Sequence, residues 1–435
     1  MNSKATYRFK QVLFAGILLV LCLPLLQQHL RLIHVSPLKG AIKPLEKVYF
    51  SKSGWWEGAY QENYNNWFNE NFGFRNTLVR LHNQLALDLY HTAKANGVIV
   101  GKDGYLYELN YIKAYTGQDY IGDDAVKEVM HKLKAVQDSL EKRNVTLVVC
   151  LAAGKASFYP EYIPDEFGKA ADKTNYKIFA RELQANNINH IDFNKWFVDR
   201  KNTSPYLLYP KTGIHWSRYG SLQAADSLVK WVEWKRKVDV SNMVWDKVLL
   251  SDSIRSPDDD IGEAMNIMFP FRPLKMGYPE YHYQDTTGKQ KVRLMTISDS
   301  FFWNFFDVGL APNSFSEITF YYYNKEIHHS NGSPMGYSDP EQTNADAEKH
   351  DVIMIMATES NLSRLGWGFI NQAYDHFVLH KKVENRDRLI NKYESSIRMD
   401  KTWMQAIQKK AAEKGIPLDS MIRLDAIFMA EQEMK

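Results

Sequence analysis

The chain has 435 residues, 45% of them hydrophobic, which is enough for two or three domains and a large core. Its 54 basic and 51 acidic residues are well mixed and leave a net charge of +3, which excludes the strong positive field of a nucleic-acid-binding protein. Only two cysteines occur, Cys22 and Cys150, so neither a disulfide framework nor a cysteine-based zinc site is expected.

The first 35 residues have the pattern of a membrane anchor. Lys4, Arg8 and Lys10 precede an uncharged apolar run at residues 12–26. A run of this length also fits a secretory signal sequence or the buried helix of a soluble protein. Because no small-x-small cleavage site follows, we expect an uncleaved signal-anchor with a cytoplasmic stub. The protein would then cross the membrane once, with the remaining residues on the extracytoplasmic side, which is the periplasm in a Gram-negative cell.

Residues 36–95 are predicted to form a membrane-proximal helical region. Trp56, Tyr60, Tyr64 and Trp67 recur close to helical spacing. A Trp-rich helix beside a membrane span could lie at the lipid interface, but we expect this one to pack against the main domain.

Residues 96–380 are predicted to form one α/β domain. The domain opens with GVIVGKDGYLYEL, in which the Asp-Gly pair indicates a short hairpin. Amphipathic helices then alternate with five apolar runs: VTLVVCLAA, INHIDF, VRLMTIS, ITFYYY and DVIMIMA. Continuous apolar strands between helices are typical of a mainly parallel sheet covered on both faces, so we expect a three-layer sandwich with about five strands. Residues 240–290 interrupt this rhythm as an inserted loop region, and residues 381–435 form a charged helical tail.

Two polar residues stand out at the predicted carboxyl edge of the sheet, where ligands bind in open α/β folds. Ser300, in LMTISDSFFW, lies at a strand-to-helix turn, where its own amide can also donate to an oxyanion. A serine nucleophile needs a base, and His215, in KTGIHWSRYG, lies in another loop at the same edge. The same two residues would equally fit a helix N-cap and a polar turn.

No metal site or cofactor is predicted. The 13 histidines are scattered along the chain, and no His-Glu-x-x-His run occurs.

These motifs resemble those of SGNH-type serine esterases. SDSF resembles their nucleophile block, and IHW resembles the histidine block of the branch that includes the alginate O-acetylation proteins of the AlgX and AlgJ type and DHHW-like proteins. FGFRNTLVRLHNQ, GKDGYLYE, KASFYPEYIP and HDVIMIMATESNL also look like this branch, over about residues 65–380. The resemblance implies an SGNH-like fold with Ser300 as the nucleophile and His215 as the general base.

The chain departs from this family at the catalytic acid. The family has an aspartate two residues before the histidine, where this chain has Gly213. Three outcomes are open: a Ser-His dyad oriented by a backbone carbonyl, an acid supplied from elsewhere, or a protein that binds without catalysis. Asp192 is one candidate replacement, and the run Asp258-Asp259-Asp260 is another.

Three further residues are candidates for the site. Asn361, in TESNL, lies where the last strand could supply an oxyanion donor, although it would equally cap a helix. Trp216 and Lys155 are candidates for substrate binding, and Lys155 could instead shape the pocket.

The resemblance implies an extracytoplasmic O-acetyltransferase that acts on a cell-surface or exported polysaccharide through an acetyl-serine. Its implied partner is a membrane-bound O-acyltransferase that delivers acetyl groups across the inner membrane, in which the chain itself would be anchored. A polysaccharide acetylesterase would use the same first half-reaction with water as the acceptor. A non-catalytic polysaccharide-binding or assembly factor with a degenerate triad is the alternative that Gly213 raises.

Overall fold

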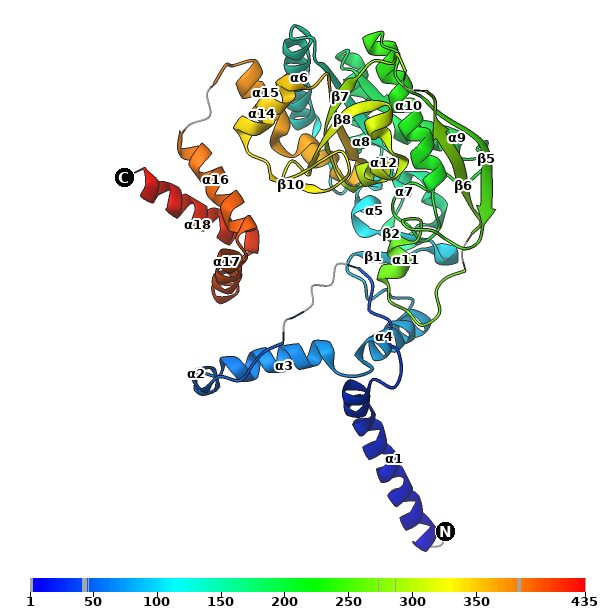
Figure 1. Cartoon of the computed structure of the whole chain (residues 1–435). Helices are drawn as coiled ribbons and strands as arrows, with labels where there is room; N and C mark the ends of the chain where they lie inside the picture. The colour runs from blue at the N-terminus through cyan, green and yellow to red at the C-terminus, as the bar shows by residue number, and fades with distance from the viewer. Residues whose placement is uncertain are drawn as a thin grey trace.

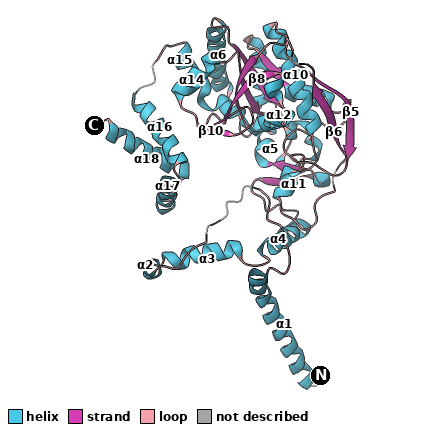
Figure 2. Ribbon diagram, viewed as in Figure 1, coloured by secondary structure: helices cyan, strands magenta, loops and turns pink. Residues whose placement is uncertain are grey.

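The computed structural model describes residues 3–40, 45, 47–272, 274–285, 287–381 and 385–434. Figure 1 shows a long helix, α1 (Ser3–Leu30), projecting from one end of a body that is built around a sheet, and a separate group of helices near the C-terminus. In Figure 2 the strands gather in the body, whereas the two terminal regions are helical. The body is therefore the part of the chain that positions the site.

A seven-stranded sheet, in the order β10-β9-β8-β7-β11-β3-β4, forms the centre of the body. Its strands are β3 (Thr146–Ala152), β4 (His190–Asp192), β7 (Val292–Ser298), β8 (Phe315–Tyr322), β9 (Glu326–His328), β10 (Pro334–Tyr337) and β11 (Val352–Thr358). The five strands from β8 to β4 are parallel, and β9 and β10 extend the β8 edge antiparallel. The prediction of a mainly parallel sheet is confirmed, and the five predicted strands are the five parallel ones.

The apolar strands occupy the centre because both of their faces are covered. Every residue of β3, β7 and β11 is buried except Arg293. Along β3, Val148 and Cys150 belong to one hydrophobic cluster, and Leu147 and Val149 belong to the other. Since successive side chains of a strand point to opposite faces, one continuous apolar run serves both clusters.

Helices on the two faces complete the predicted three-layer sandwich. One cluster includes side chains of α5 (Leu109–Tyr115), α7 (Lys155–Phe158), α9 (Phe193–Arg200), α10 (Arg218–Arg236), α12 (Trp303–Val308) and α13 (Leu310–Asn313). The other includes side chains of α6 (Asp123–Glu141), α8 (Asn175–Ala185), α14 (Pro340–Lys349) and α15 (Phe369–Phe377).

Two short antiparallel ribbons are added to this sandwich. The hairpin expected near Asp103 is present, with β1 (Val98–Val100) paired to β2 (Leu106–Glu108). The region 240–290, expected to be loop, instead contains β5 (Met243–Ser251) paired to β6 (Met276–Tyr283). Most residues of these two strands are partly buried or exposed, and their sequences lack the continuous apolar run that marked the central strands. The connection between them carries α11 (Asp260–Ala264).

The N-terminal region holds α1, α2 (Lys52–Trp56), α3 (Ala59–Asn71) and α4 (Arg75–Tyr90). Within the described part of the chain, α1 is the one helix long and apolar enough to cross a membrane, and its apolar window is exposed, so it is a candidate anchor. All residues of α3 are at least partly exposed, so the expectation that this helix packs against the main domain is wrong.

Three helices, α16 (Asn385–Met399), α17 (Lys401–Lys414) and α18 (Leu418–Glu433), end the chain. They pack around their own hydrophobic cluster, in which Ile397, Ile407 and Ile422 are fully buried. The predicted tail is therefore helical, while the boundaries proposed between the regions stay predictions.

Candidate active site

Ser300 lies two residues after the end of β7, at the carboxyl edge of the sheet, and starts a short helical turn (Ser300–Phe302). The buried Asp299 fixes this turn. One carboxylate oxygen of Asp299 accepts from the Phe301 N–H at 3.2 Å. The other accepts from the Thr358 N–H at 2.9 Å and the Thr358 hydroxyl at 2.8 Å, at the end of the neighbouring β11. Asp299 thus links the turn that carries Ser300 to the end of β11. This role of Asp299 was not predicted from the sequence. Its position between the end of a strand and the serine is the feature that could have indicated it.

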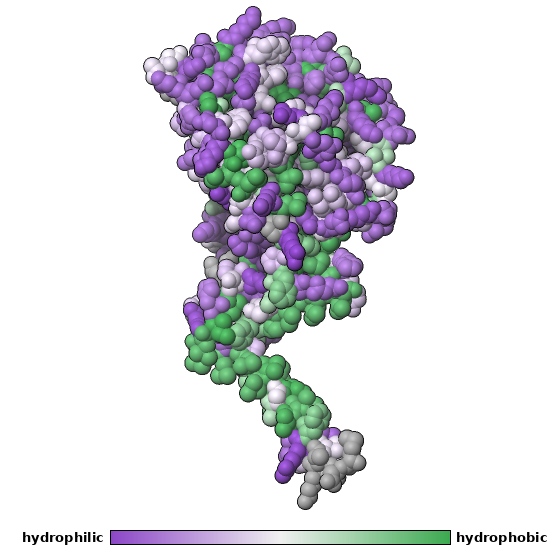
Figure 3. All heavy atoms as spheres, turned by 90° about the vertical axis from the view of Figure 1, so that its right-hand side faces the viewer, coloured by the Kyte–Doolittle hydropathy of each residue, from purple (hydrophilic) through white to green (hydrophobic). Residues whose placement is uncertain are grey.

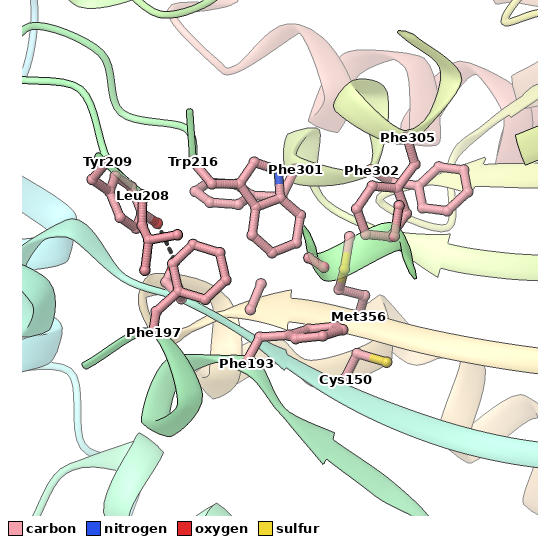
Figure 4. Close-up of a cluster of buried hydrophobic side chains, with 14 of the residues drawn as sticks. Cys150, Phe193, Phe197, Leu208, Tyr209, Trp216, Phe301, Phe302, Phe305 and Met356 are labelled. Atoms are coloured by element: carbon pink, nitrogen blue, oxygen red, sulfur yellow. Dashed lines mark hydrogen bonds between the residues drawn. The ribbon is translucent and has the colours of Figure 1, made fainter. Parts of the chain in front are cut away.

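His215 lies against Ser300, as the sequence predicted. Its Nε2 is 2.9 Å from the Ser300 Oγ. The next residue, Trp216, is fully buried and donates from Nε1 to the Asn304 side-chain oxygen at 3.1 Å. Figure 4 shows Trp216 among the aromatic side chains of the core, and its ring stacks on Phe305 with centroids 5.3 Å apart. The imidazole therefore extends from a loop that is anchored in the core.

Asp260, at the start of α11, places its carboxylate against His215. Its Oδ2 lies 2.5 Å from the Nδ1 of His215. Its Oδ1 accepts from the backbone N–H groups of Ile214 and Ile261, each at 2.8 Å. Because Nδ1 faces a carboxylate, the neutral imidazole keeps its proton there and presents the Nε2 lone pair to the Ser300 hydroxyl, as in a Ser-His-Asp triad. Of the outcomes left open by the sequence, an acid from elsewhere in the chain is the one that the geometry matches.

The alternative acid, Asp192, lies elsewhere. Its carboxylate accepts from the hydroxyl of Tyr176 at 3.1 Å and caps α9 by accepting from the Lys195 N–H at 2.8 Å. The expectation that Asp192 orients His215 is therefore wrong, because its carboxylate serves a tyrosine and a helix end.

Gly213 is what allows the acid loop to approach. A Cβ at this position would lie 2.7 Å from the Cγ of Pro210 and 2.8 Å from the backbone oxygen of Asp258, closer than Cβ atoms come to other atoms. The place of a side chain at residue 213 is thus taken by the backbone two residues before Asp260. Asp258 is itself buried and accepts from the Arg218 N–H at 3.1 Å, so the acidic run is not a solvated face.

Lys155 stabilises the loop that carries Gly213 and His215. Its side chain is fully buried, and its Nζ donates to the backbone oxygens of Gly213 at 2.5 Å and Lys211 at 2.7 Å. Lys155 and the buried Trp216 therefore shape the loop that carries His215, and the expectation that they bind substrate directly is wrong.

Asn361, predicted as a possible oxyanion donor, donates to other protein groups. Its side-chain amide donates to the Oδ2 of Asp299 at 2.9 Å and to the Thr358 hydroxyl at 3.2 Å. The amide thus belongs to the network that fixes the serine turn. The N–H of Ser300, the first residue of its helical turn, has no partner within that turn and stays a candidate oxyanion donor.

Charges around His215 favour its protonated form. Burial lowers the pKa of this imidazole, but the hydrogen bond and charge of Asp260, with the charges of Asp299 and Glu108, outweigh burial and raise the pKa overall. Glu108, at the end of β2, has its own pKa raised, first by burial and then by the charge of Asp260. Burial lowers the pKa of Lys155 to about 7, against the opposing charge of Asp260.

A metal-centred site has no support in the described ranges, where no three His, Cys, Asp or Glu side chains are grouped to hold an ion. The arrangement of Asp260, His215 and Ser300 is instead one that activates a serine hydroxyl as a nucleophile.

Residues 98–275 match the family model described as the SGNH hydrolase-like domain of the acetyltransferase AlgX. The matched segment contains His215 and Asp260 and ends before Ser300. The chain is also 28% identical over 162 residues to the probable alginate O-acetylase AlgJ of Pseudomonas aeruginosa, a match that covers 37% of this chain and 39% of AlgJ. With the corresponding Pseudomonas putida protein it shares 24% identity over 134 residues, 31% of this chain and 33% of the relative. The chain thus matches well under half the length of these relatives.

Among solved structures, the chain resembles the O-acetyltransferase domain of Pseudomonas putida AlgJ, with 16% identity, a TM-score of 0.40 and coverage of 64% of this chain and 99% of that one. Bacillus cereus PatB1 shows 13% identity and a TM-score of 0.40, covering 62% of this chain and 98% of PatB1. Pseudomonas aeruginosa AlgX shows 12% identity and a TM-score of 0.39, covering 63% of this chain and 66% of AlgX.

Replacing the acid should lower the pKa of His215. In Asp260→Asn the charge that favours imidazolium is gone, so we expect the His215 titration, followed by NMR of histidine-labelled protein, to move to lower pH. Asp192→Asn is the matched control and should leave the titration in place. An equal shift in both variants, or a shift in neither, would contradict the assignment of Asp260.

Adding a methyl group at Gly213 should separate the two loops. In Gly213→Ala the Cβ meets backbone and a proline ring, so we expect a loss of about 1–3 kcal/mol of unfolding free energy and a lower pKa of His215. In Gly262→Ala, a change in the segment that carries Asp260, the nearest atoms to the new Cβ all belong to the Asp259 side chain, which can rotate away, so this variant should cost less. Equal melting temperatures for the two variants would argue against the close approach at Gly213.

Proposed function

We propose that this chain, whose residues 98–275 belong to the SGNH hydrolase-like family of AlgX-type acetyltransferases, is an O-acetyltransferase that uses Ser300 as its nucleophile. The observation that carries the proposal is the hydrogen-bonded series from Asp260 through His215 to Ser300. It supplies an activated hydroxyl, a base and a group that stabilises imidazolium, which acyl transfer requires.

Two half-reactions follow from this geometry. As the Ser300 Oγ attacks the acetyl carbonyl, its proton passes to the Nε2 of His215, and the oxyanion is stabilised by the Ser300 N–H. The tetrahedral intermediate collapses, the bond to the donor oxygen breaks, and the leaving group takes the proton from His215. An acceptor hydroxyl then attacks the acetyl-serine and gives its proton to His215, which returns it to Ser300 Oγ as the ester bond breaks.

The acceptor we propose is a hydroxyl of an exported or cell-surface polysaccharide. The relatives at 28% and 24% identity are probable alginate O-acetylases, which supports a polysaccharide over a small alcohol. Helix α1 supports an inner-membrane anchor with the body outside the cytoplasm, and a membrane-bound O-acyltransferase would then be the source of acetyl groups.

An acetylesterase would share the first half-reaction, and one observation favours keeping it as a second candidate. The side chains of His215 and Asp260 are 17% and 26% exposed, so water can reach the site. A binding factor without catalysis has lost its main support, because Gly213 does not leave His215 without an acid.

Removing any member of the series should strongly reduce turnover of an acetyl ester. With p-nitrophenyl acetate and the full chain in detergent, we expect Ser300→Ala and His215→Ala to lower kcat/KM about 10³-fold or more, and Asp260→Asn about 10²- to 10⁴-fold. Because the charge of Asp260 raises the pKa of His215, Asp260→Asn should also move the acidic limb of the pH profile to lower pH. Asp192→Asn should match the unchanged chain in both respects.

Added oligosaccharides distinguish an O-acetyltransferase from an acetylesterase. A transferase should form acetylated oligosaccharide, detected by mass spectrometry, at the expense of free acetate, whereas an esterase should release acetate only. Wild-type rates no higher than those of Ser300→Ala would contradict both.

A further inference from the structure

The turn between α3 and α4 packs directly against the end of α1. A Cβ at Gly73 would lie 2.1 Å from the backbone oxygen of Pro24 and 2.7 Å from the backbone nitrogen of Gln28, so only glycine allows this approach. Pro24 belongs to the last part of the apolar run of α1, and Gln27 and Gln28 follow that run. The start of α4 and the end of α3 are thus fixed at the level where the apolar part of α1 ends.

Helix α3 runs across the axis of α1 rather than along it (Figure 1). The whole of α2 and α3 therefore stays close to the level set by Gly73. If α1 spans a bilayer, this level is the boundary between hydrocarbon and headgroups on the side of the body.

One side of α2 and α3 is a continuous row of aromatic rings, which we call the aromatic row. Neighbouring ring centroids in it are 5.4–6.3 Å apart, and its members are Phe50, Trp55, Tyr60, Tyr64, Trp67, Phe68 and Phe72. Trp56, beside the row, is 85% exposed, and Tyr64 is 37% exposed. The opposite side of α3 carries exposed polar residues such as Glu62 and Asn66.

Tryptophan and tyrosine are enriched at membrane–water interfaces, because their rings prefer the headgroup region to either water or hydrocarbon. In Figure 3 the hydrophobic surface of α1 continues into the neck of the molecule above it, whereas the body is mostly hydrophilic. A cavity of about 750 Å³ opens at the same level, and its lining includes the basic side chains of Arg31 and Lys47, as suits a layer of lipid phosphates. Arg75 also lines it but is paired with Glu70 at 2.6 Å.

We propose that α2 and α3 form an in-plane seat, with the aromatic row in the headgroup region of the bilayer that α1 spans. The proposal rests on the anchoring role proposed for α1. The seat would fix the distance of the body from the membrane, because α4 begins just after Gly73 and contacts the segment that follows Asp260. There the Asn83 side chain donates to the backbone oxygens of Met265, at 2.9 Å, and Asn266, at 3.1 Å, in the segment just after Asp260.

Spin labels on the full chain test the seat. The protein is reconstituted in vesicles of phosphatidylethanolamine and phosphatidylglycerol, and collision rates of each label with oxygen and with a water-soluble nickel chelate give its depth. Cys22 lies exposed in α1 and Cys150 is buried, so the unchanged chain carries a label in the span itself. In a Cys22→Ser background, Tyr64→Cys places a label in the aromatic row, and Asn66→Cys is the matched control on the polar side of the same helix.

We expect the Cys22 label to be in hydrocarbon, the Tyr64→Cys label at phosphate depth and the Asn66→Cys label in water. Equal nickel access at the two α3 positions, with Cys22 in lipid, would overturn the seat and leave the anchor standing. Shielding of the Tyr64→Cys label from both reagents would also overturn it, because a second copy or another protein would then cover the aromatic row. Nickel access at Cys22 would instead remove the anchor, and the seat with it.

Discussion

The approach of the Asp258 backbone to Gly213 is the constraint on which the site depends. It brings together two loops, residues 210–215 and 258–262, that are far apart in the chain, and the Gly262 N–H then donates to the Thr212 carbonyl at 2.9 Å. With the loops joined, Asp260 uses both carboxylate oxygens, one on the His215 imidazole and one on backbone N–H groups. A carboxylate held in this way needs little rearrangement when His215 becomes protonated. Such preorganisation favours acid–base catalysis. Gly213 thus makes room for the loop that carries Asp260, and this is why we propose Asp260 as the acid that residue 213 does not supply.

The remainder of the site is held by the ends of the central strands. The helix after β3 contributes Lys155, whose buried side chain donates to the His215 loop, and β7 leads into Asp299, whose carboxylate is tied to Thr358 at the end of β11. Each of these polar groups is buried and paired, so moving one would leave another without its partner. Such networks specify one arrangement of nucleophile and base more strictly than the apolar core beneath them. The aromatic packing around Trp216 then fixes the height of His215 above that core.

Much of this could be predicted from the sequence, and the limits have physical reasons. Strands β3, β7 and β11 were predictable because burial on both faces makes each one a continuous apolar run. Strands β9 and β10, of three and four residues, are too short to show such a pattern. Ser300 and His215 were predictable because strand ends and their loops share one edge of a parallel sheet. Asp260 could be named only as part of an acidic run, since it lies 45 residues after His215 and a contact between loops at that separation has no periodicity in sequence. Lys155 and Asn361 were given direct roles because polar residues after strands suggest a binding edge, and sequence does not reveal which of them are turned inward to other protein groups.

The central claim is that Asp260 makes His215 an effective base for Ser300 in acetyl transfer. The most direct measurement is the rate at which Ser300 itself gains an acetyl group, followed by rapid quench, intact mass and peptide mapping in the full chain. We predict one acetyl group on Ser300 within the first turnover of the unchanged chain and of Asp192→Asn, and acetylation slowed by orders of magnitude in Asp260→Asn. Acetylation of Ser300 at equal rates in all three proteins, or acetylation that maps to another residue, would contradict it.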